Sequence, residues 1–223
     1  FLVNLLLIPV AELTEILDQT QTAIAGWRKI LGVLATPVEV ADPSPGRPLP
    51  DGPLSVTFDG VRFAYRTGPE VLRGIDLHLP AGTSTAIVGE TGSGKTTIAH
   101  LLCRLAEPTH GRVLVGGIDL AEVDGAARRR AVRLVPQDGF LFDATIEENV
   151  RLGRLDATRE DVEQAFRSLG LGAWLDDLPG GVTTPVGERG ASLSVGERQL
   201  VALARAQISD PGVLVLDEAT SSV

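Results

Sequence analysis

The sequence predicts an α/β fold in which helices flank a mostly parallel β-sheet. From residue 83 onward, short apolar runs alternate with segments of helical periodicity, the order typical of parallel strands joined by helices. A group of strand-like runs near residue 55 adds antiparallel strands and makes the fold mixed. Apolar residues make up 43% of the 223 residues, which is enough for one sizeable core with an appendage.

The predicted elements follow one another as short segments after residue 54. The predicted strands are Ser55–Phe58, Val61–Tyr65, Ile75–Leu79, Thr83–Val88, Arg112–Val115, Val132–Val135 and Val213–Leu216. The predicted helices are Thr96–Leu105, Asp161–Leu169 and Val195–Gln207. Four consecutive apolar residues in the last strand indicate burial on both of its faces.

Residues 1–35 precede this domain and contain a predicted amphipathic helix. From Leu13 to Leu34, apolar residues recur mostly at three- and four-residue steps and share one helix face. The opening ten residues are nearly all apolar, but crossing a bilayer takes about 20, and they lack the features of a signal peptide. Two interpretations stay open: a helix packed on the domain, or the cytoplasmic end of a membrane helix.

Residues 36–53 form a predicted linker. The prolines in this stretch are Pro37, Pro43, Pro45, Pro48, Pro50 and Pro53. Proline at this density prevents helix formation and favours an extended, semi-rigid chain. We therefore place a domain boundary here, with the main domain over residues 54–223.

The charge balance argues against a nucleic-acid-binding protein. The formal net charge is −9, from 29 acidic and 20 basic residues, whereas phosphate backbones are bound by basic surfaces. The only basic run, Arg128–Arg130, is explained by a solvated helix face. Cys103 is the single cysteine, so an internal disulfide is excluded, and we expect it to act as a small apolar helix residue.

Residues 89–96 match the phosphate-binding loop pattern GxxxxGK[ST] directly after an apolar strand and before a helix. Its members are Gly89, Glu90, Thr91, Gly92, Ser93, Gly94, Lys95 and Thr96. Glycines let the backbone N–H groups turn toward phosphate oxygens, and the helix N-terminus adds its positive dipole end. Lys95 would contact the β- and γ-phosphates, and the Thr96 hydroxyl would bind Mg²⁺. The pattern predicts mononucleotide binding.

A second acidic motif follows the last predicted strand. Asp217 and Glu218 stand at the carboxyl end of Val213–Leu216, where ligands bind in open α/β sheets. Asp217 would hold Mg²⁺, and Glu218 would act as the general base that polarises the attacking water. Together with the phosphate-binding loop, the motif predicts a P-loop NTPase.

Residues 193–197, Leu-Ser-Val-Gly-Glu, resemble the ABC signature LSGGQ, with Val195 and Glu197 as departures. A capping box from Ser194 to Glu197 explains the same pattern, and both interpretations can hold together. The resemblance to ABC nucleotide-binding domains covers residues 54–223. It implies a P-loop NTPase core with an N-terminal antiparallel β subdomain and a helical signature subdomain. It also implies that Ser194, Gly196 and Glu197 face the ATP bound by a partner domain.

Further motifs resemble those of ABC exporters. Phe63-Ala64-Tyr65 resembles the A-loop, which implies that Tyr65 stacks on adenine; a packed strand residue is the alternative. Val135-Pro136-Gln137 resembles the Q-loop, which implies that Gln137 contacts Mg²⁺ and senses the membrane domain. Residues 187–190, Gly-Glu-Arg-Gly, resemble the X-loop, and residues 219–222 resemble the start of a D-loop. Thr97 joins the residues implied to bind nucleotide.

The resemblance implies MgATP as the bound nucleotide, with Lys95, Gln137 and Glu218 in the catalytic set. The implied partners are a second nucleotide-binding domain, as homodimer or heterodimer, and the coupling helices of a transmembrane domain. The implied place is the cytoplasmic side of the cell membrane, with the N-terminal helix as the membrane contact and no nucleic acid bound. We expect the sequence to be a fragment cut within the D-loop, lacking the H-loop histidine and catalytically incomplete alone.

Two other functions compete with this prediction. A soluble ABC ATPase of DNA repair or translation would carry a basic surface or large insertions and no apolar N-terminal helix. A degenerate site of a heterodimeric exporter would hold ATP as a structural ligand. The intact Glu218 argues for hydrolysis. Val195 departs from the signature that would face the partner's ATP, so a degenerate site there stays an alternative.

Overall fold

The structure, a computed structural model, describes the backbone of residues 2–217 and the side chains of residues 12–217. The chain divides into two compact units, one ending at Ala41 and the other beginning at Asp42.

The first unit is dominated by helix α1, Leu2–Leu34. The predicted amphipathic segment is helical throughout. Its apolar side chains are exposed within this unit, with Trp27 at 63% and Leu34 at 76%. In the described part of the chain, no helix combines the length and apolar character that a membrane crossing requires.

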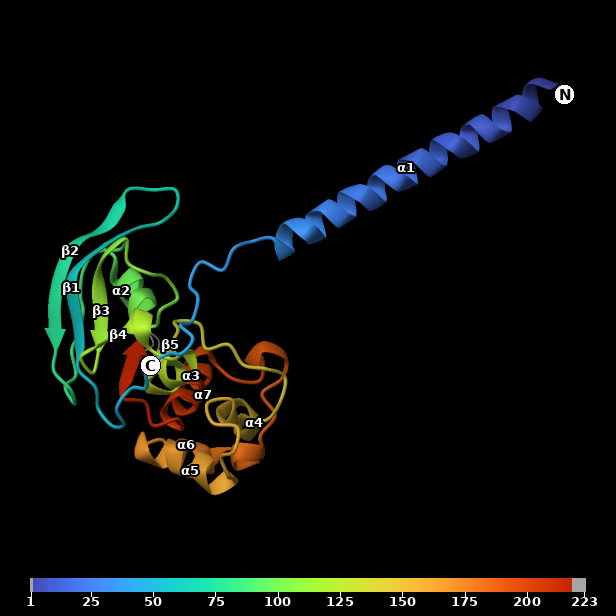
Figure 1. The fold of residues 1–223 in the computed structure, drawn as a ribbon. Coiled ribbons are helices and arrows are strands. Elements are labelled where there is room, and N and C mark those ends of the chain that lie inside the picture. The colour runs from blue at the N-terminus through green and yellow to red at the C-terminus, as the bar shows by residue number, and fades with distance from the viewer. Residues whose placement is uncertain (1, 218–223) are drawn as a thin grey trace. The chain divides into compact units, whose positions relative to one another are not determined.

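The second unit begins with an antiparallel sheet of four strands (Figure 1). The strands are β1 Val56–Ala64, β2 Glu70–Leu79, β3 His110–Val115 and β4 Ile118–Asp119, in the order β2-β1-β3-β4. The runs predicted at 55–58 and 61–65 are one strand, whose register shifts between Phe58 and Val61. A Cβ on Gly111 would lie 2.4 Å from the Asp59 carbonyl oxygen, and its φ is +76°, so only glycine fits beside this irregularity.

Helix α2, Lys95–Leu102, packs against this sheet (Figure 1). Leu101 and Leu102 join a buried cluster with Phe58, Val61 and other inward-facing strand residues. The helix ends before the predicted Leu105. Cys103 still donates its N–H to the Ala99 carbonyl, but Arg104 turns to a φ of +52°. A residue in the left-handed region cannot continue the helix. Burial raises the pKa of the Cys103 thiol to about 11.

The described residues do not confirm a mostly parallel sheet. Only β5, Val132–Val135, and β6, Val213–Leu216, pair in parallel. The predicted strand Thr83–Val88 lies exposed and pairs with no strand in the described part of the chain, and Val88 is 88% exposed. Its apolar, β-branched composition favours an extended chain, but a strand exists only where a neighbour supplies backbone partners.

A helical group forms the other side of this unit (Figure 1). Its helices are α4 Ile146–Arg151, α5 Arg159–Ser168, α6 Gly172–Asp177 and α7 Val195–Gln207, with the 3₁₀ turns η2 Gly181–Thr183 and η3 Glu188–Gly190. α4, α5 and α7 each begin with a complete capping box, which satisfies otherwise unpaired N–H groups. Their apolar faces meet around the fully buried Phe166 and Val201.

The beginning of the second unit is tied to the turn that follows α2 and to α3, Gly125–Ala131. Asp42 forms ion pairs with Arg128 at 2.9 Å, Arg129 at 3.3 Å and Arg104 at 3.6 Å. The Arg104 and Arg128 side chains are only 6% and 10% exposed. The expectation of a fully solvated basic run is therefore wrong at Arg128. Helical periodicity turns this residue inward, where Asp42 supplies the opposite charge that a buried guanidinium requires.

A second contact follows along the same segment. Arg47 pairs with Glu122 of the 3₁₀ turn η1, Leu120–Glu122, at 2.9 Å. Its backbone forms a bridge with Val123 and exchanges hydrogen bonds with Glu122 and Asp124. The residues that follow Ala41 are therefore part of the second unit. The extent of the linker, residues 36–53, stays a prediction.

Candidate nucleotide-binding site

The predicted phosphate-binding loop ends at the N-terminus of α2. Gly92 and Gly94 have φ values of +82° and +97°. A Cβ on Gly94 would lie 2.8 Å from Leu72 Cδ2, so close packing against β2 also requires glycine there. Lys95 and Thr96 are the first residues of the helix, where backbone N–H groups lack intrahelical partners and favour an anion. Residues 89–93 are exposed.

The Lys95 ammonium bends back over this loop. Its Nζ donates to the carbonyl oxygens of Gly89 at 2.7 Å and Glu90 at 2.9 Å. These bonds place the charge at the mouth of the loop, beside the N-terminus of α2. A phosphate could replace the two carbonyl acceptors, because charge-assisted bonds to phosphate are stronger than bonds to neutral carbonyls.

Thr96 and Asp217 meet across the site. The Thr96 hydroxyl donates to Asp217 Oδ1 at 3.4 Å, and the Asp217 N–H donates to the Val135 carbonyl at 3.1 Å. The end of β6 is thereby held against β5 and beside the start of α2. A hydroxyl and a carboxylate are hard oxygen ligands, so this pair fits the requirements of Mg²⁺.

Tyr65 stands directly after β1. It is 49% exposed, its ring lies edge-on to Phe63 with centroids 4.8 Å apart, and its hydroxyl is 3.2 Å from Thr97 Oγ1. Thr97 lies in the first turn of α2 and is buried. The ring is thus fixed at the edge of the loop region and remains accessible to a base.

Gln137 lies just beyond β5 and is exposed. Its carbonyl accepts a 3.1 Å bond from the Gln199 side chain of α7. A Cβ on the nearby Gly139 would lie 2.8 Å from the Arg198 carbonyl oxygen, so the segment after Gln137 runs close against α7. Phe140 and Phe142 follow as an exposed edge-to-face pair.

The predicted signature forms the start of α7. Ser194 is the N-cap, its hydroxyl accepts the Glu197 N–H at 3.3 Å, and Glu197 accepts the Ser194 N–H at 2.7 Å. Leu193 is buried, whereas Val195 is 54% exposed. The capping box is therefore present. The Glu197 pKa is lowered by the hydrogen bonds from the Ser194 backbone and hydroxyl, followed by the bond from Trp174.

The predicted X-loop coincides with η3 and has a tightly constrained backbone. Gly187 and Gly190 have φ values of +72° and +75°, and Arg189 has a φ of +53°. Glu188 and Arg189 are exposed, while Gly190 is buried beside Arg198. The turn therefore exposes the side chains of Glu188 and Arg189, which stand between the two glycines.

The structure brings together some of the predicted site residues and leaves others apart. Lys95, Thr96 and Asp217 share one region, with Thr97 and Tyr65 joined to each other. Among residues 12–217, no hydrogen bond or ion pair connects the signature turn with the phosphate-binding loop. Glu218 and the D-loop residues 219–222 lie outside the described residues.

Sequence reasoning missed two contacts that shape this region. Trp174 donates to the signature residue Glu197 at 3.3 Å, and Asp42 joins Arg104, just after α2, to Arg128 of α3. No periodicity or motif marks either residue in the sequence. Both contacts join segments far apart along the chain, and only the fold shows them.

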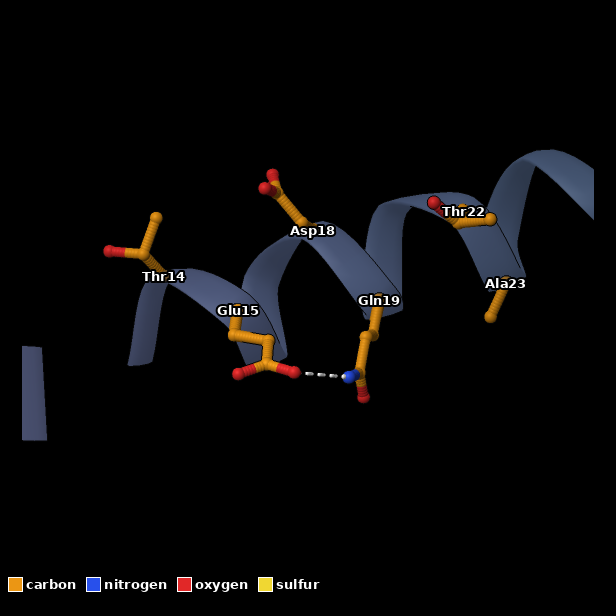
Figure 2. Close-up of a pocket in the computed structure, with 6 residues that line it drawn as sticks. All are labelled: Thr14, Glu15, Asp18, Gln19, Thr22 and Ala23. Atoms are coloured by element: carbon orange, nitrogen blue, oxygen red, sulfur yellow. Dashed lines mark hydrogen bonds between the residues drawn. The ribbon is translucent and has the colours of Figure 1, made fainter. Parts of the chain in front are cut away.

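A shallow hollow on α1 is not a second candidate. Figure 2 shows that one helix alone supplies its lining residues, which are Thr14, Glu15, Asp18, Gln19, Thr22 and Ala23. Glu15 accepts a 3.2 Å bond from Gln19, four residues on. Neighbours on a helix face satisfy each other in this way without a ligand.

A phosphate-binding loop at the start of a helix, joined through Thr96 to an acid that ends a parallel strand, defines a P-loop nucleotide-binding domain. Residues 72–221 match the family described as ABC transporter. The chain belongs to this family and has the ATP-binding domain of its exporter branch.

Several relatives show how far the similarity extends. A fatty acid ABC transporter ATP-binding/permease protein of Mycobacterium bovis is 40% identical over 96% of this chain and 34% of the relative. An ATP-dependent lipid A-core flippase of Chromohalobacter salexigens is 43% identical over 96% of this chain and 37% of the relative. The human mitochondrial iron-sulfur clusters transporter ABCB7 is 40% identical over 97% of this chain and 29% of the relative.

A solved structure agrees with these relatives. It is a bacterial Atm1-family ABC exporter with ATP bound, with a TM-score of 0.83 and 40% identity over 91% of this chain and 36% of that chain. The ABC ATPase fold is therefore established for this chain. The chain spans about a third of the length of the curated relatives it matches.

Proposed function

We propose that this chain binds MgATP and hydrolyses it to power export of a substrate across a membrane. The observation that carries this proposal is the convergence of Lys95, Thr96 and Asp217. The Lys95 charge lies at the loop mouth, and a pair of oxygen ligands stands beside it. Lys95 and the N–H groups at the start of α2 bind the phosphates, and Tyr65 stacks on the adenine. Mg²⁺, held by Thr96, Asp217 and Gln137, neutralises phosphate charge when bound.

Hydrolysis requires a positioned water and a base. Glu218, next to Asp217, accepts a proton from water as the water oxygen bonds to the γ-phosphorus. The bond between the γ-phosphorus and its bridging oxygen breaks, which yields ADP and inorganic phosphate. Such catalysis consists mainly of positioning and electrostatic stabilisation.

The proposed partners are a second nucleotide-binding domain and a transmembrane domain. A second nucleotide-binding domain presents its signature turn, Ser194 to Glu197 in this chain, to the γ-phosphate. The segment after Gln137 and the X-loop contact the coupling helices of a transmembrane domain. Exposed Phe140, Phe142 and Arg189 support this role, because exposed aromatic and arginine side chains favour contact surfaces. α1 extends a transmembrane helix into the cytoplasm at the cell membrane.

The substitution Glu218→Gln tests this proposal in the transporter that contains the chain. The amide has nearly the shape of the carboxylate but cannot act as the base, so ATP binding persists while hydrolysis falls by about 10²-fold or more. The ATP-bound dimer accumulates as a result. The exposed Glu160 on α5 provides the control Glu160→Gln, which leaves turnover intact. Normal turnover by Glu218→Gln assigns the chain to the degenerate class instead.

A further inference from the structure

Trp174, on α6, reaches the signature turn through a carboxylate. Its indole Nε1 donates to Glu197 Oε1 at 3.3 Å, while Glu197 Oε2 accepts the Ser194 N–H at 2.7 Å. The Ser194 hydroxyl in turn accepts the Glu197 N–H at 3.3 Å. Both carboxylate oxygens are thus held by N–H donors, one from the turn itself and one from a different helix.

The Glu197 carboxylate carries a negative charge into a turn proposed to face phosphates. Hydrogen bonds from Ser194 and Trp174 lower its pKa, so it is ionised at neutral pH. In the described part of the chain, no lysine or arginine forms an ion pair with it, and the adjacent Arg198 donates to the Leu193 carbonyl at 2.9 Å. A free carboxylate there would repel the γ-phosphate.

The indole is held in place by the helical core. Its ring centroid lies 5.6 Å from that of the fully buried Phe166, and the next residue, Leu175, is 3% exposed. Trp174 packs against the cluster that contains both residues. A donor fixed in this way keeps its partner in one orientation, because little side-chain freedom remains to be lost.

We propose that Trp174 is a positioning residue for the signature turn. It holds the Glu197 carboxylate against the Ser194 N–H, so that the Ser194 hydroxyl and the Gly196 backbone, and not the carboxylate, face the nucleotide of a second domain. This inference rests on the proposed function, in which two domains enclose each ATP. It explains how a signature with glutamate at its fifth position accepts a phosphate.

The test measures MgATP-dependent association of the purified chain in a Glu218→Gln background, by sedimentation or light scattering. Trp174→Phe removes the donor and keeps an aromatic ring. It should raise the MgATP concentration for half-maximal association roughly two- to fivefold, the size of one partly exposed charge interaction. Affinity for a fluorescent ATP analogue at monomeric concentrations should stay unchanged, because Trp174 acts on the partner's nucleotide.

The double variant Trp174→Phe/Glu197→Gln should recover the original midpoint, because the misplaced charge is gone. Trp27→Phe is the matched control, because Trp27 lies on α1 and is 63% exposed. The chain has two tryptophans, so in the Trp27→Phe background the emission of Trp174 should change when Glu197→Gln is added. This spectroscopic readout also serves if Trp174→Phe fails to fold.

Several outcomes would overturn the inference. One is that Trp174→Phe behaves like Trp27→Phe, and another is that the double variant stays as defective as Trp174→Phe, which indicates packing alone. An unchanged Trp174 emission contradicts the contact itself. A chain that binds MgATP but never associates also contradicts the inference. A chain that binds no MgATP contradicts the proposed function instead.

Discussion

Tyr65 illustrates how a single side chain in this site can be both packed and available. Its hydroxyl contacts Thr97 and its ring edge contacts Phe63, yet half of the side chain is exposed. Packing of this kind restricts the ring before a base arrives. Pre-organised aromatic side chains lose less conformational entropy on binding, so the contacts support a stacking role and do not compete with it.

Replacement of Tyr65 separates stacking from packing. Tyr65→Ala should weaken MgATP binding by about 1–3 kcal/mol, the range for base–aromatic stacking. Tyr65→Phe keeps the ring and loses the Thr97 contact, so its effect should be smaller, at most about 1 kcal/mol for a partly exposed hydrogen bond. Equilibrium titration with a fluorescent ATP analogue checks both. Equal behaviour of the alanine and phenylalanine variants would show that Tyr65 only packs.

At the scale of elements, the capping boxes of α4, α5 and α7 make helix stability depend on pH. Hydrogen bonds from the Thr145 backbone N–H and hydroxyl hold the pKa of Glu148 below its ordinary value of 4.5. The Asp161 pKa is lowered chiefly by the Thr158 N–H. A carboxylate with a depressed folded pKa stabilises the fold above its unfolded pKa, and this contribution is lost as the pH falls through the folded pKa.

The free energy of unfolding should therefore decrease as the pH is lowered below about 4.5, the unfolded value for glutamate. Urea unfolding at a series of pH values measures it. Glu148→Gln cannot titrate, so its stability curve should be flatter over this interval than that of the parent chain. Parallel curves for the two proteins would mean that Glu148 has the same pKa in the folded and unfolded states.

Asp42 supplies one of the attachments of the segment after Ala41, through its ion pairs with Arg104 and Arg128. Asp42→Asn leaves Arg128 buried without its 2.9 Å counter-charge, while Arg104 retains its 2.7 Å ion pair with Glu107. Because the Asp42 carboxylate is 41% exposed, the free energy of unfolding should fall by less than it would for a fully buried pair. The urea midpoint measures it. Asp51→Asn, at an exposed position in the same segment, should change little and provides the control.

At the scale of the whole molecule, the sequence predicted best where local signals were strong. α7 and β6 have the predicted bounds, because a Ser–Glu capping box starts the helix and an unbroken apolar run forms the strand. The Thr83–Val88 run is also rich in β-branched residues, yet it pairs with no strand in the described residues. Composition sets a preference for extended backbone, but pairing depends on distant segments.

Burial of charge was hidden from the sequence for the same reason. Arg128 stands in a basic run, and only the position of Asp42 shows that one of its three arginines turns inward. Likewise, the signature pattern predicted both the cap and a phosphate-facing turn, but not the indole that holds its glutamate. The start of α2 beside Gly94 was predictable because the glycine–lysine–threonine pattern is local, whereas phosphate binding by residues 89–96 stays a prediction.

The central claim is that the loop ending at Lys95 binds the phosphates of MgATP. Equilibrium titration of the purified chain with MgATP, by calorimetry or with a fluorescent analogue, tests it most directly when Lys95→Ala is measured in parallel. We expect saturable binding at one site in the parent chain and a nearly complete loss of affinity in the variant, since the charge-assisted phosphate bonds disappear. Equal affinity of both proteins, or no binding by the parent chain, would contradict it.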